Sequence, residues 1–166
     1  MDTKAFQDYY SDEVSHCYGC GRLNAEGLHI ESRWDGEEAV CVFEPRSYHT
    51  AILGYVYGGL IASLIDCHGT GTAAAATYRA QDRAMDSHPP LRFLTASLQV
   101  DYLRPTPLGV PLEVRARVEE VKGRKVTVTA TVAASGALCA RGRVVAVQMP
   151  DGMLGSQSRR DQSSTR

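Results

Sequence analysis

A glycine pair and an aspartate two helical turns further on are the residues of this chain best suited to chemistry. Gly58 and Gly59 open an apolar run that predicts a helix, and Asp66 follows seven residues after Gly59. At about 100° per residue, Gly59 and Asp66 fall within about 20° of each other on the helix surface. A free N–H at a helix N-terminus can polarise a carbonyl, while a carboxylate can attack it or activate water. The spacing therefore favours attack on an acyl group along one helix face.

Each of these residues also has a purely structural explanation. An aspartate in an apolar helix could pair with an arginine, and a glycine pair could simply allow close packing. An unpaired carboxylate among apolar side chains costs free energy, so the residues alone leave both interpretations of Asp66 open. Ser63 lies on the same helix face as Asp66.

One long helix and six strands are needed to position these residues. The helix is predicted from Tyr57 to about Ala80, and it is apolar on most sides, so we expect it to be buried. Alternating patterns predict strands at 28–34, 38–43, 94–102, 112–119, 126–132 and about 138–148. In the 94–102 strand, Thr95 falls on the polar side. One curved antiparallel sheet wrapped around one long central helix, an α+β fold, satisfies this order of elements.

The domain built from these elements is predicted to span residues 17–150. Before it, residues 1–16 form an N-terminal extension in which we expect a short helix anchored by Tyr9 and Tyr10. After it, residues 151–166 are rich in Ser, Gln and Arg, a composition typical of a disordered tail. A sheet of this kind leaves an edge strand open, and pairing with a second copy would cover that edge.

Composition and charge exclude several classes of protein. The 166 residues suit one domain, and a formal net charge of −1 gives no bulk attraction to nucleic acid or to an anionic membrane. No apolar run is long enough to cross a bilayer. The first residues lack the basic-then-apolar order of a secretion signal, so we expect a cytoplasmic protein with reduced cysteines.

The cysteines do not form a complete metal motif in the sequence. Cys17 and Cys20 are separated by two residues, but a structural zinc site needs a full tetrahedral set of ligands. The others, Cys41, Cys67 and Cys139, are scattered along the chain. We therefore expect no metal ion.

Three segments of the chain carry a family resemblance. They are CYGCG at 17–21, followed by Gly27 and Leu28; GYVYGG at 54–59, continuing to Asp66; and the strand at 94–105, followed by GRK at 123–125. In this order and spacing they resemble the hotdog-fold acyl-CoA thioesterases of the phenylacetate-pathway and Them4-like group. The resemblance covers about residues 17–150. It implies a homodimer or homotetramer with active sites at the subunit interface, and no cofactor beyond the coenzyme A of the substrate.

The resemblance also implies roles for particular residues. Asp66 would be the nucleophile or general base, and the Gly59 N–H would bind the thioester oxygen. Thr95 would supply a hydroxyl from the partner subunit that places water. Tyr57 stands where the family usually has histidine, and would help to position the carbonyl. Further candidates for substrate contact are Gly58, His49 and Ser63 and, for the phosphates of coenzyme A, Arg104, Lys122, Arg124 and Lys125.

Two other functions stay open on the same fold. One is a non-catalytic binder of acyl or aromatic ligands, which the tyrosine at position 57 favours. The other is an enoyl-CoA hydratase, an enzyme that commonly pairs an acid with a histidine. His68 lies roughly opposite Asp66 on the helix, which disfavours that pairing. The acyl group of a thioester substrate is not specified by the sequence.

Overall fold

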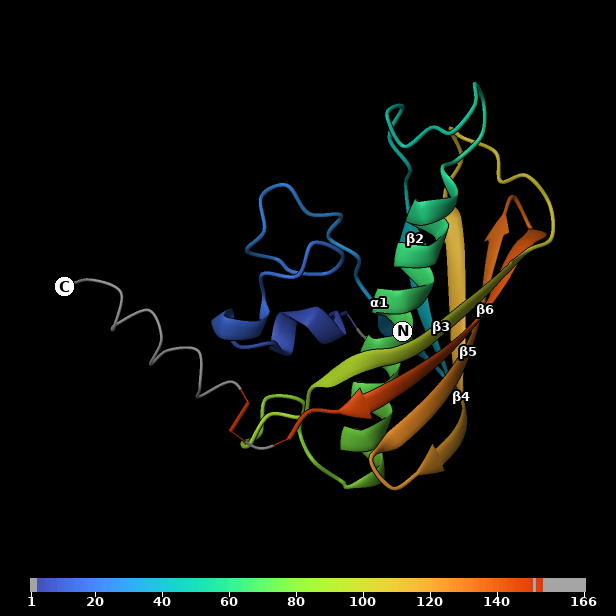
Figure 1. Ribbon diagram of the computed structural model, residues 1–166. Coiled ribbons are helices and arrows are strands. Elements are labelled where there is room, and N and C mark those ends of the chain that lie inside the picture. The colour runs from blue at the N-terminus through green and yellow to red at the C-terminus, as the bar shows by residue number, and fades with distance from the viewer. Residues whose placement is uncertain (1–2, 151, 154–166) are drawn as a thin grey trace.

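In the computed structural model, which describes residues 3–150 and 152–153, one long helix lies across a curved sheet of six strands (Figure 1). The helix is α1 (Gly58–Ala80), and two 3₁₀ helices, Phe6–Tyr9 and Asp12–Val14, precede the sheet. The strands are β1 (Arg33–Asp35), β2 (Glu38–Phe43), β3 (Phe93–Tyr102), β4 (Leu112–Lys122), β5 (Lys125–Ala134) and β6 (Ala137–Gln148). They lie in the order β1-β2-β4-β5-β6-β3, and each neighbouring pair is antiparallel. This arrangement confirms the predicted α+β fold.

The helix α1 is buried, as its apolar sequence predicts, because the sheet covers one side and the N-terminal segment covers another. Leu64 and Ile65 are fully buried in the shared core. Helix and sheet approach closely at Gly69, where an added Cβ would lie 2.7 Å from Cγ2 of Val144 in β6. A side chain at this position would therefore push the helix away from the sheet.

The N-terminal extension contains two 3₁₀ turns in place of the short helix that we expected. Its buried anchor is Phe6, whose ring centroid lies 5.2 Å from that of Trp34. Tyr9 and Tyr10 are partly buried, and the Tyr10 ring packs against the Arg92 guanidinium. The predicted tail lies outside the described residues from 154 onward.

The strand predicted at 28–34 is the main error in the secondary structure. Only its end becomes β1, whereas the 38–43 prediction is confirmed as β2. The N–H of Leu28 donates to the Tyr18 carbonyl and the N–H of Ile30 to the Gly19 carbonyl. These residues therefore pair with the loop at 17–21 and not with a sheet strand. Ile30 is buried between two exposed neighbours, so the segment shows the alternating pattern of a strand without being one.

A β-bulge in β3 changes which side chains face α1. Thr95 pairs with Ala146 of β6, but the next pair is Ser97 with Val145, so one extra residue stands between them. Directly paired residues share a face of the sheet, and Ala146 is fully buried on the helix side. Thr95 therefore faces α1. Our prediction that it lies on the polar side is wrong because a bulge reverses the alternation that follows it.

The strand β3 forms one edge of the sheet and is largely exposed. It pairs with β6 alone among the described strands. Apolar and polar residues alternate along its sequence, but both kinds are largely exposed. Leu94, Leu98 and Tyr102 are 49%, 38% and 54% exposed. An apolar edge of this kind is a natural surface for strand pairing between two chains.

Candidate active site

Asp66 and Thr95 come together although they are 29 residues apart in the sequence. Asp66 is half-buried in the third turn of α1, and its Oδ1 accepts a hydrogen bond from the Thr95 hydroxyl of β3. The other carboxylate oxygen, Oδ2, has no partner among the residues that the structure describes. The family resemblance implied a hydroxyl from the partner subunit, but Thr95 reaches Asp66 within one chain. The bulge in β3 makes this contact possible.

A cavity of about 320 Å³ lies beside this acid and hydroxyl pair. Asp66 and Thr95 line one part of it, and its apolar wall includes Val14, Phe93 and Met149. An apolar cavity with a few convergent polar groups is the usual form of a small-molecule site. A carboxylate with one anchored and one free oxygen can accept a proton from water or attack a carbon there.

The N-terminus of α1 offers an unpaired N–H group. Tyr57 is the N-cap residue, and its carbonyl accepts the first bond from the Leu60 N–H. The N–H of Gly59 has no partner within the described part of the chain. The Tyr57 ring lies directly over Gly59, where an added Cβ would overlap it. The Tyr102 hydroxyl donates to the Gly58 carbonyl at 2.7 Å, which attaches the end of β3 to this helix terminus.

Gly59 and Asp66 share a helix face as predicted, but they are too far apart to act on one carbonyl within a chain. Seven residues at about 1.5 Å rise correspond to about 10 Å along the axis. The carbonyl oxygen that Gly59 would bind and the carbonyl carbon that Asp66 would attack are adjacent atoms, so both groups would have to reach almost the same point. This separation suggests that Gly59 and Asp66 act on one carbonyl only when they come from different chains.

Ser63 and His49 already have partners in the structure. The Ser63 hydroxyl donates to the Gly59 carbonyl at 2.9 Å, which reinforces the first turns of α1. His49 Nδ1 accepts a bond from the Arg46 N–H at 3.0 Å, and its ring packs against Tyr48. Burial, and to a lesser degree the charge of Arg46, lowers the pKa of His49. His49 lies outside the Asp66 cavity, although its carbonyl accepts the N–H of Tyr57.

The basic residues considered for phosphate binding lie towards opposite ends of α1. Arg104 lines a groove with Gly58 at the N-terminal end, and it forms no ion pair with other described residues. The hairpin that carries Lys122, Arg124 and Lys125 lies beside the C-terminal turns of α1, and the Arg124 side chain donates to a backbone carbonyl of β6. The structure does not bring this hairpin to Gly59 within one chain.

Arg92 is a cavity residue that no sequence pattern indicated. It is 8% exposed, its guanidinium carbon lies 4.1 Å from the centroid of the Tyr10 ring, and it donates to the Leu91 carbonyl. Its buried Nε has no hydrogen-bond partner among the described residues. Arg92 therefore places a positive charge in the wall of the Asp66 cavity.

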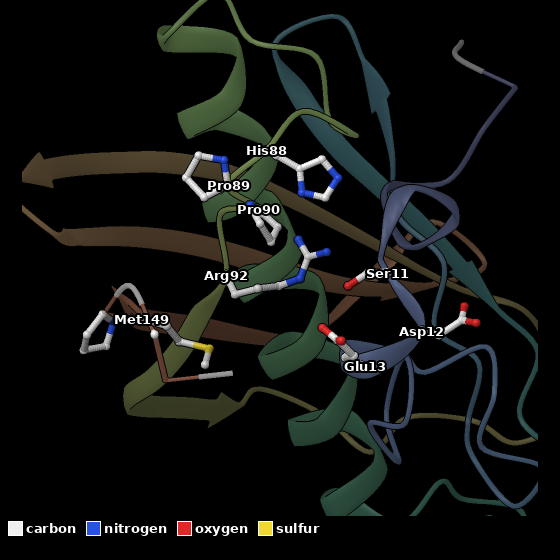
Figure 2. Close-up of a pocket in the computed structure, with 10 residues that line it drawn as sticks. Ser11, Asp12, Glu13, His88, Pro89, Pro90, Arg92 and Met149 are labelled. Carbon is white, nitrogen blue, oxygen red and sulfur yellow. The ribbon is translucent and has the colours of Figure 1, made fainter. Parts of the chain in front are cut away.

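A second hollow, of about 510 Å³, is also lined by Arg92 (Figure 2). Figure 2 shows the Arg92 side chain between two walls, one formed by His88 and Pro90 and the other by Ser11 and Glu13. Among the described residues that line this hollow, no nucleophile is hydrogen-bonded to a base. We therefore place the candidate chemistry in the cavity of Asp66.

The cysteines are less scattered than the sequence suggested. The thiol sulfurs of Cys17, Cys20 and Cys67 all lie within 4.8 Å of one another and line the Asp66 cavity. Sequence reasoning separated Cys67 from the other two because the 50 residues between Cys17 and Cys67 gave no sign that the loop at 17–21 folds onto α1.

The sequence and the fold match one known family. The model of the Thioesterase superfamily matches residues 53–140, a range that contains α1 and β3. The chain belongs to this superfamily. In the described part of the chain, no helix is both long and apolar enough to cross a membrane.

Particular relatives support the same assignment. The crystal structure of a thioesterase superfamily protein from Shewanella loihica PV-4 is similar, with 49% identity, a TM-score of 0.66, and coverage of 87% of this chain and 99% of that chain. Acyl-coenzyme A thioesterase THEM4 of Xenopus laevis is 37% identical over 87 residues, which are 52% of this chain and 33% of the relative. THEM4 of Rattus norvegicus is 28% identical over 125 residues, 73% of this chain and 48% of the relative. The chain thus spans a third to a half of the length of these two curated relatives.

Proposed function

We propose that this protein hydrolyses an acyl-CoA thioester to a free acid and coenzyme A. The observation that carries the proposal is the hydrogen bond from Thr95 to Asp66 at the wall of an apolar cavity. The thioesterase superfamily match and the similarity to THEM4, an acyl-coenzyme A thioesterase, support the choice of substrate class.

In the proposed reaction, Asp66 acts on the thioester carbonyl directly or through water. As a base, Oδ2 accepts a proton from water while the water oxygen bonds to the carbonyl carbon. As a nucleophile, Asp66 forms a mixed anhydride that water then cleaves. In both routes the carbon–sulfur bond breaks, and the coenzyme A thiolate leaves and takes up a proton. Thr95 holds Oδ1 so that the other oxygen faces the substrate.

The carbonyl oxygen becomes negatively charged during this reaction and needs a donor. The Gly59 N–H at the start of α1 is free for this purpose, and the helix dipole adds to its effect. Because Gly59 and Asp66 of one chain are about 10 Å apart, we propose that each site takes Gly59 from one chain and Asp66 with Thr95 from another. The exposed apolar edge at Leu94 and Leu98 supports such a homodimer.

Tyr57 is placed to position the substrate. Tyr57 is 57% exposed and its ring covers Gly59, so we expect a substrate at the Gly59 N–H to contact or displace this ring. We propose that the Tyr57 hydroxyl and the Gly58 backbone orient the thioester. Arg104, in the groove beside Gly58, is then the best-placed cation for a phosphate of coenzyme A. In a dimer, the hairpin of Lys122, Arg124 and Lys125 would have to come from the other chain.

The geometry disfavours the hydratase and offers one feature in favour of the ligand binder. A hydratase that uses His68 is disfavoured because the ring is fully buried, with Nδ1 2.8 Å from Ser32 Oγ and Nε2 3.1 Å from the Ala39 carbonyl. A non-catalytic ligand binder is favoured by one feature, the cover that Tyr57 places over Gly59. Activity measurements separate these functions.

The test is the release of free thiol from short, medium, long and aromatic acyl-CoAs, with water addition to an enoyl-CoA measured beside it. We expect turnover of at least one acyl-CoA and no hydration. Tight binding of an acyl-CoA without thiol release would support the ligand binder instead. Hydration without thiol release would support the hydratase.

A further inference from the structure

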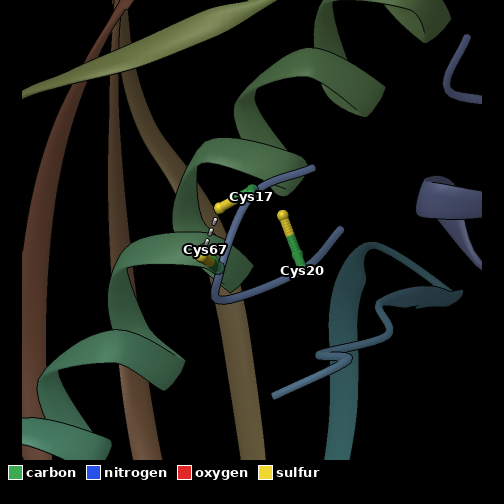
Figure 3. A group of neighbouring side chains, drawn as sticks. All are labelled: Cys17, Cys20 and Cys67. Carbon is green, nitrogen blue, oxygen red and sulfur yellow. Dashed lines mark hydrogen bonds between the residues drawn. The ribbon is translucent and has the colours of Figure 1, made fainter. Parts of the chain in front are cut away.

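Three cysteine thiols converge beside the Asp66 cavity and have no role in the proposed reaction. Cys17 and Cys20 belong to the loop that crosses over α1, and Cys67 projects from the helix towards them (Figure 3). All three sulfurs lie within 4.8 Å of one another, and those of Cys17 and Cys67 are 3.9 Å apart. Cys17 is exposed and Cys20 is partly exposed, so an ion could reach the group from solvent.

The spacing of the sulfurs fits a shared metal ion. Two thiolates that each lie about 2.3 Å from a tetrahedral zinc ion are about 3.8 Å from each other. The separation of Cys17 and Cys67 is close to this value. Thiolate is the ligand that selects zinc and other soft ions over magnesium and calcium, which prefer oxygen.

The loop is shaped to hold its sulfurs in this position. An added Cβ at Gly19 would overlap the Cys67 sulfur, and one at Gly21 would lie 2.5 Å from the backbone nitrogen of Cys17. The Gly21 N–H donates to the Cys17 carbonyl at 2.8 Å, which closes a tight turn around the cysteine pair. Only glycine fits at these two positions while the loop stays against the helix.

A metal ion binds cysteine in the thiolate form, so binding of the ion would release the thiol protons of the cluster.

We propose that Cys17, Cys20 and Cys67 bind one zinc ion through three thiolates, with the fourth position taken by water or by a ligand from the cavity. Three protein ligands with an open fourth position are an established zinc arrangement. The ion would fix the loop at 17–21 to α1, one residue from Asp66. This proposal differs from the sequence-based expectation of no metal, which rested on the apparent isolation of Cys67.

The test is the zinc content of the full chain, purified under reducing conditions from zinc-supplemented cells and measured by elemental mass spectrometry. We expect about one zinc ion per chain in the wild type, and a loss of at least tenfold in Cys17→Ser and in Cys67→Ser. Cys139→Ser is the matched control, because Cys139 lies in β6 away from the cluster and should leave the zinc content unchanged.

Replacement of zinc by cobalt gives a second readout that does not depend on enzyme activity. We expect a thiolate-to-cobalt charge-transfer band in the wild type and a weaker band in Cys17→Ser. Because Cys17 is exposed, we expect its substitution to leave the fold intact, so a weaker band would report the loss of a ligand. A wild-type chain without zinc and without this band would overturn the proposal. So would equal zinc in wild type and Cys17→Ser, or a native disulfide between Cys17 and Cys67.

Discussion

At the scale of single residues, the account depends on one carboxylate and the hydroxyl that holds it. Asp66 could be found from the sequence because an acid in an apolar helix after two glycines is conspicuous. The position of Thr95 could not, because its orientation depends on a bulge in β3 that leaves no mark on the alternating pattern. Arg92 and the approach of Cys67 to Cys17 were also hidden, since both depend on how the N-terminal segment folds onto α1.

Removal of the Thr95 hydroxyl should slow the reaction without weakening substrate binding. A hydrogen bond to a charged group contributes about 1.5–3 kcal/mol, so Thr95→Val should lower kcat roughly tenfold to a hundredfold with little change in KM. Thr95→Ser keeps the donor and should retain most of the rate. Steady-state thiol release measures both. A Thr95→Val variant with wild-type kcat would show that the hydrogen bond to Asp66 has no catalytic role.

At the scale of elements, α1 is held in place by contacts that the sequence only partly indicated. The long apolar run predicted a buried helix, and its bounds are close to those observed. His68 is fully buried, and its ring bonds to Ser32 and Ala39. Which strands would cover the helix could not be read from the pattern, because residues 28–32 alternate like a strand but pair with the loop at 17–21.

His68 should make the stability of the fold depend on pH. Burial lowers the pKa of His68 from its usual 6.5 to about 4, although the bond to Ala39 opposes this slightly. Between these values the unfolded chain binds a proton that the folded chain does not, so stability falls as pH drops from 6.5 towards 4. The full effect is at most about 3 kcal/mol.

Urea unfolding at several pH values measures this effect. His68→Gln should flatten the fall in the free energy of unfolding between pH 6.5 and 4, whereas His88→Gln, at an exposed loop residue, should follow the wild type. If His68→Gln and wild type lose stability in parallel over this window, another group causes the dependence.

Two glycines in α1 should respond differently to alanine. An added Cβ at Gly69 would lie 2.7 Å from Val144, and overpacking of this kind costs about 1–3 kcal/mol. At Gly71 the nearest atom would be Gln7 Nε2 at 3.3 Å, and alanine favours a helix over glycine by up to about 1 kcal/mol. In urea unfolding, Gly69→Ala should therefore lose at least about 1 kcal/mol more than Gly71→Ala. Equal losses would mean that the helix and sheet are not in tight contact at Gly69.

At the scale of the whole molecule, the exposed edge of β3 and the axial separation of Gly59 from Asp66 both argue for a site shared between chains. The sequence indicated an open edge and a resemblance to dimeric or tetrameric enzymes. It did not show that Asp66 and Thr95 meet within one chain, which is observed in the structure. Our proposal that the carbonyl donor comes from a second chain rests on this contact and on the rise of the helix.

Mixing two inactive variants tests the shared site. Asp66→Asn removes the acid, and Gly59→Pro removes the N–H at a first-turn position where proline is tolerated; the exposed Tyr57 ring can move aside. In a random mixture of exchanged dimers, about a quarter of the wild-type thiol release should return, because half of the dimers are mixed and each has one intact site. No recovery, with chain exchange confirmed by differently tagged copies, would place Gly59 and Asp66 of one chain in the same site.

The most direct test of the central claim is the rate of thiol release by Asp66→Asn beside wild type, on the acyl-CoA that the wild type hydrolyses fastest. Asparagine has nearly the same shape and can still bond to Thr95, but it can neither attack the carbonyl nor accept a proton from water. The account predicts a fall in kcat of about 10²–10⁴-fold, with the thermal unfolding midpoint little changed. Undiminished turnover by a folded Asp66→Asn variant would contradict it.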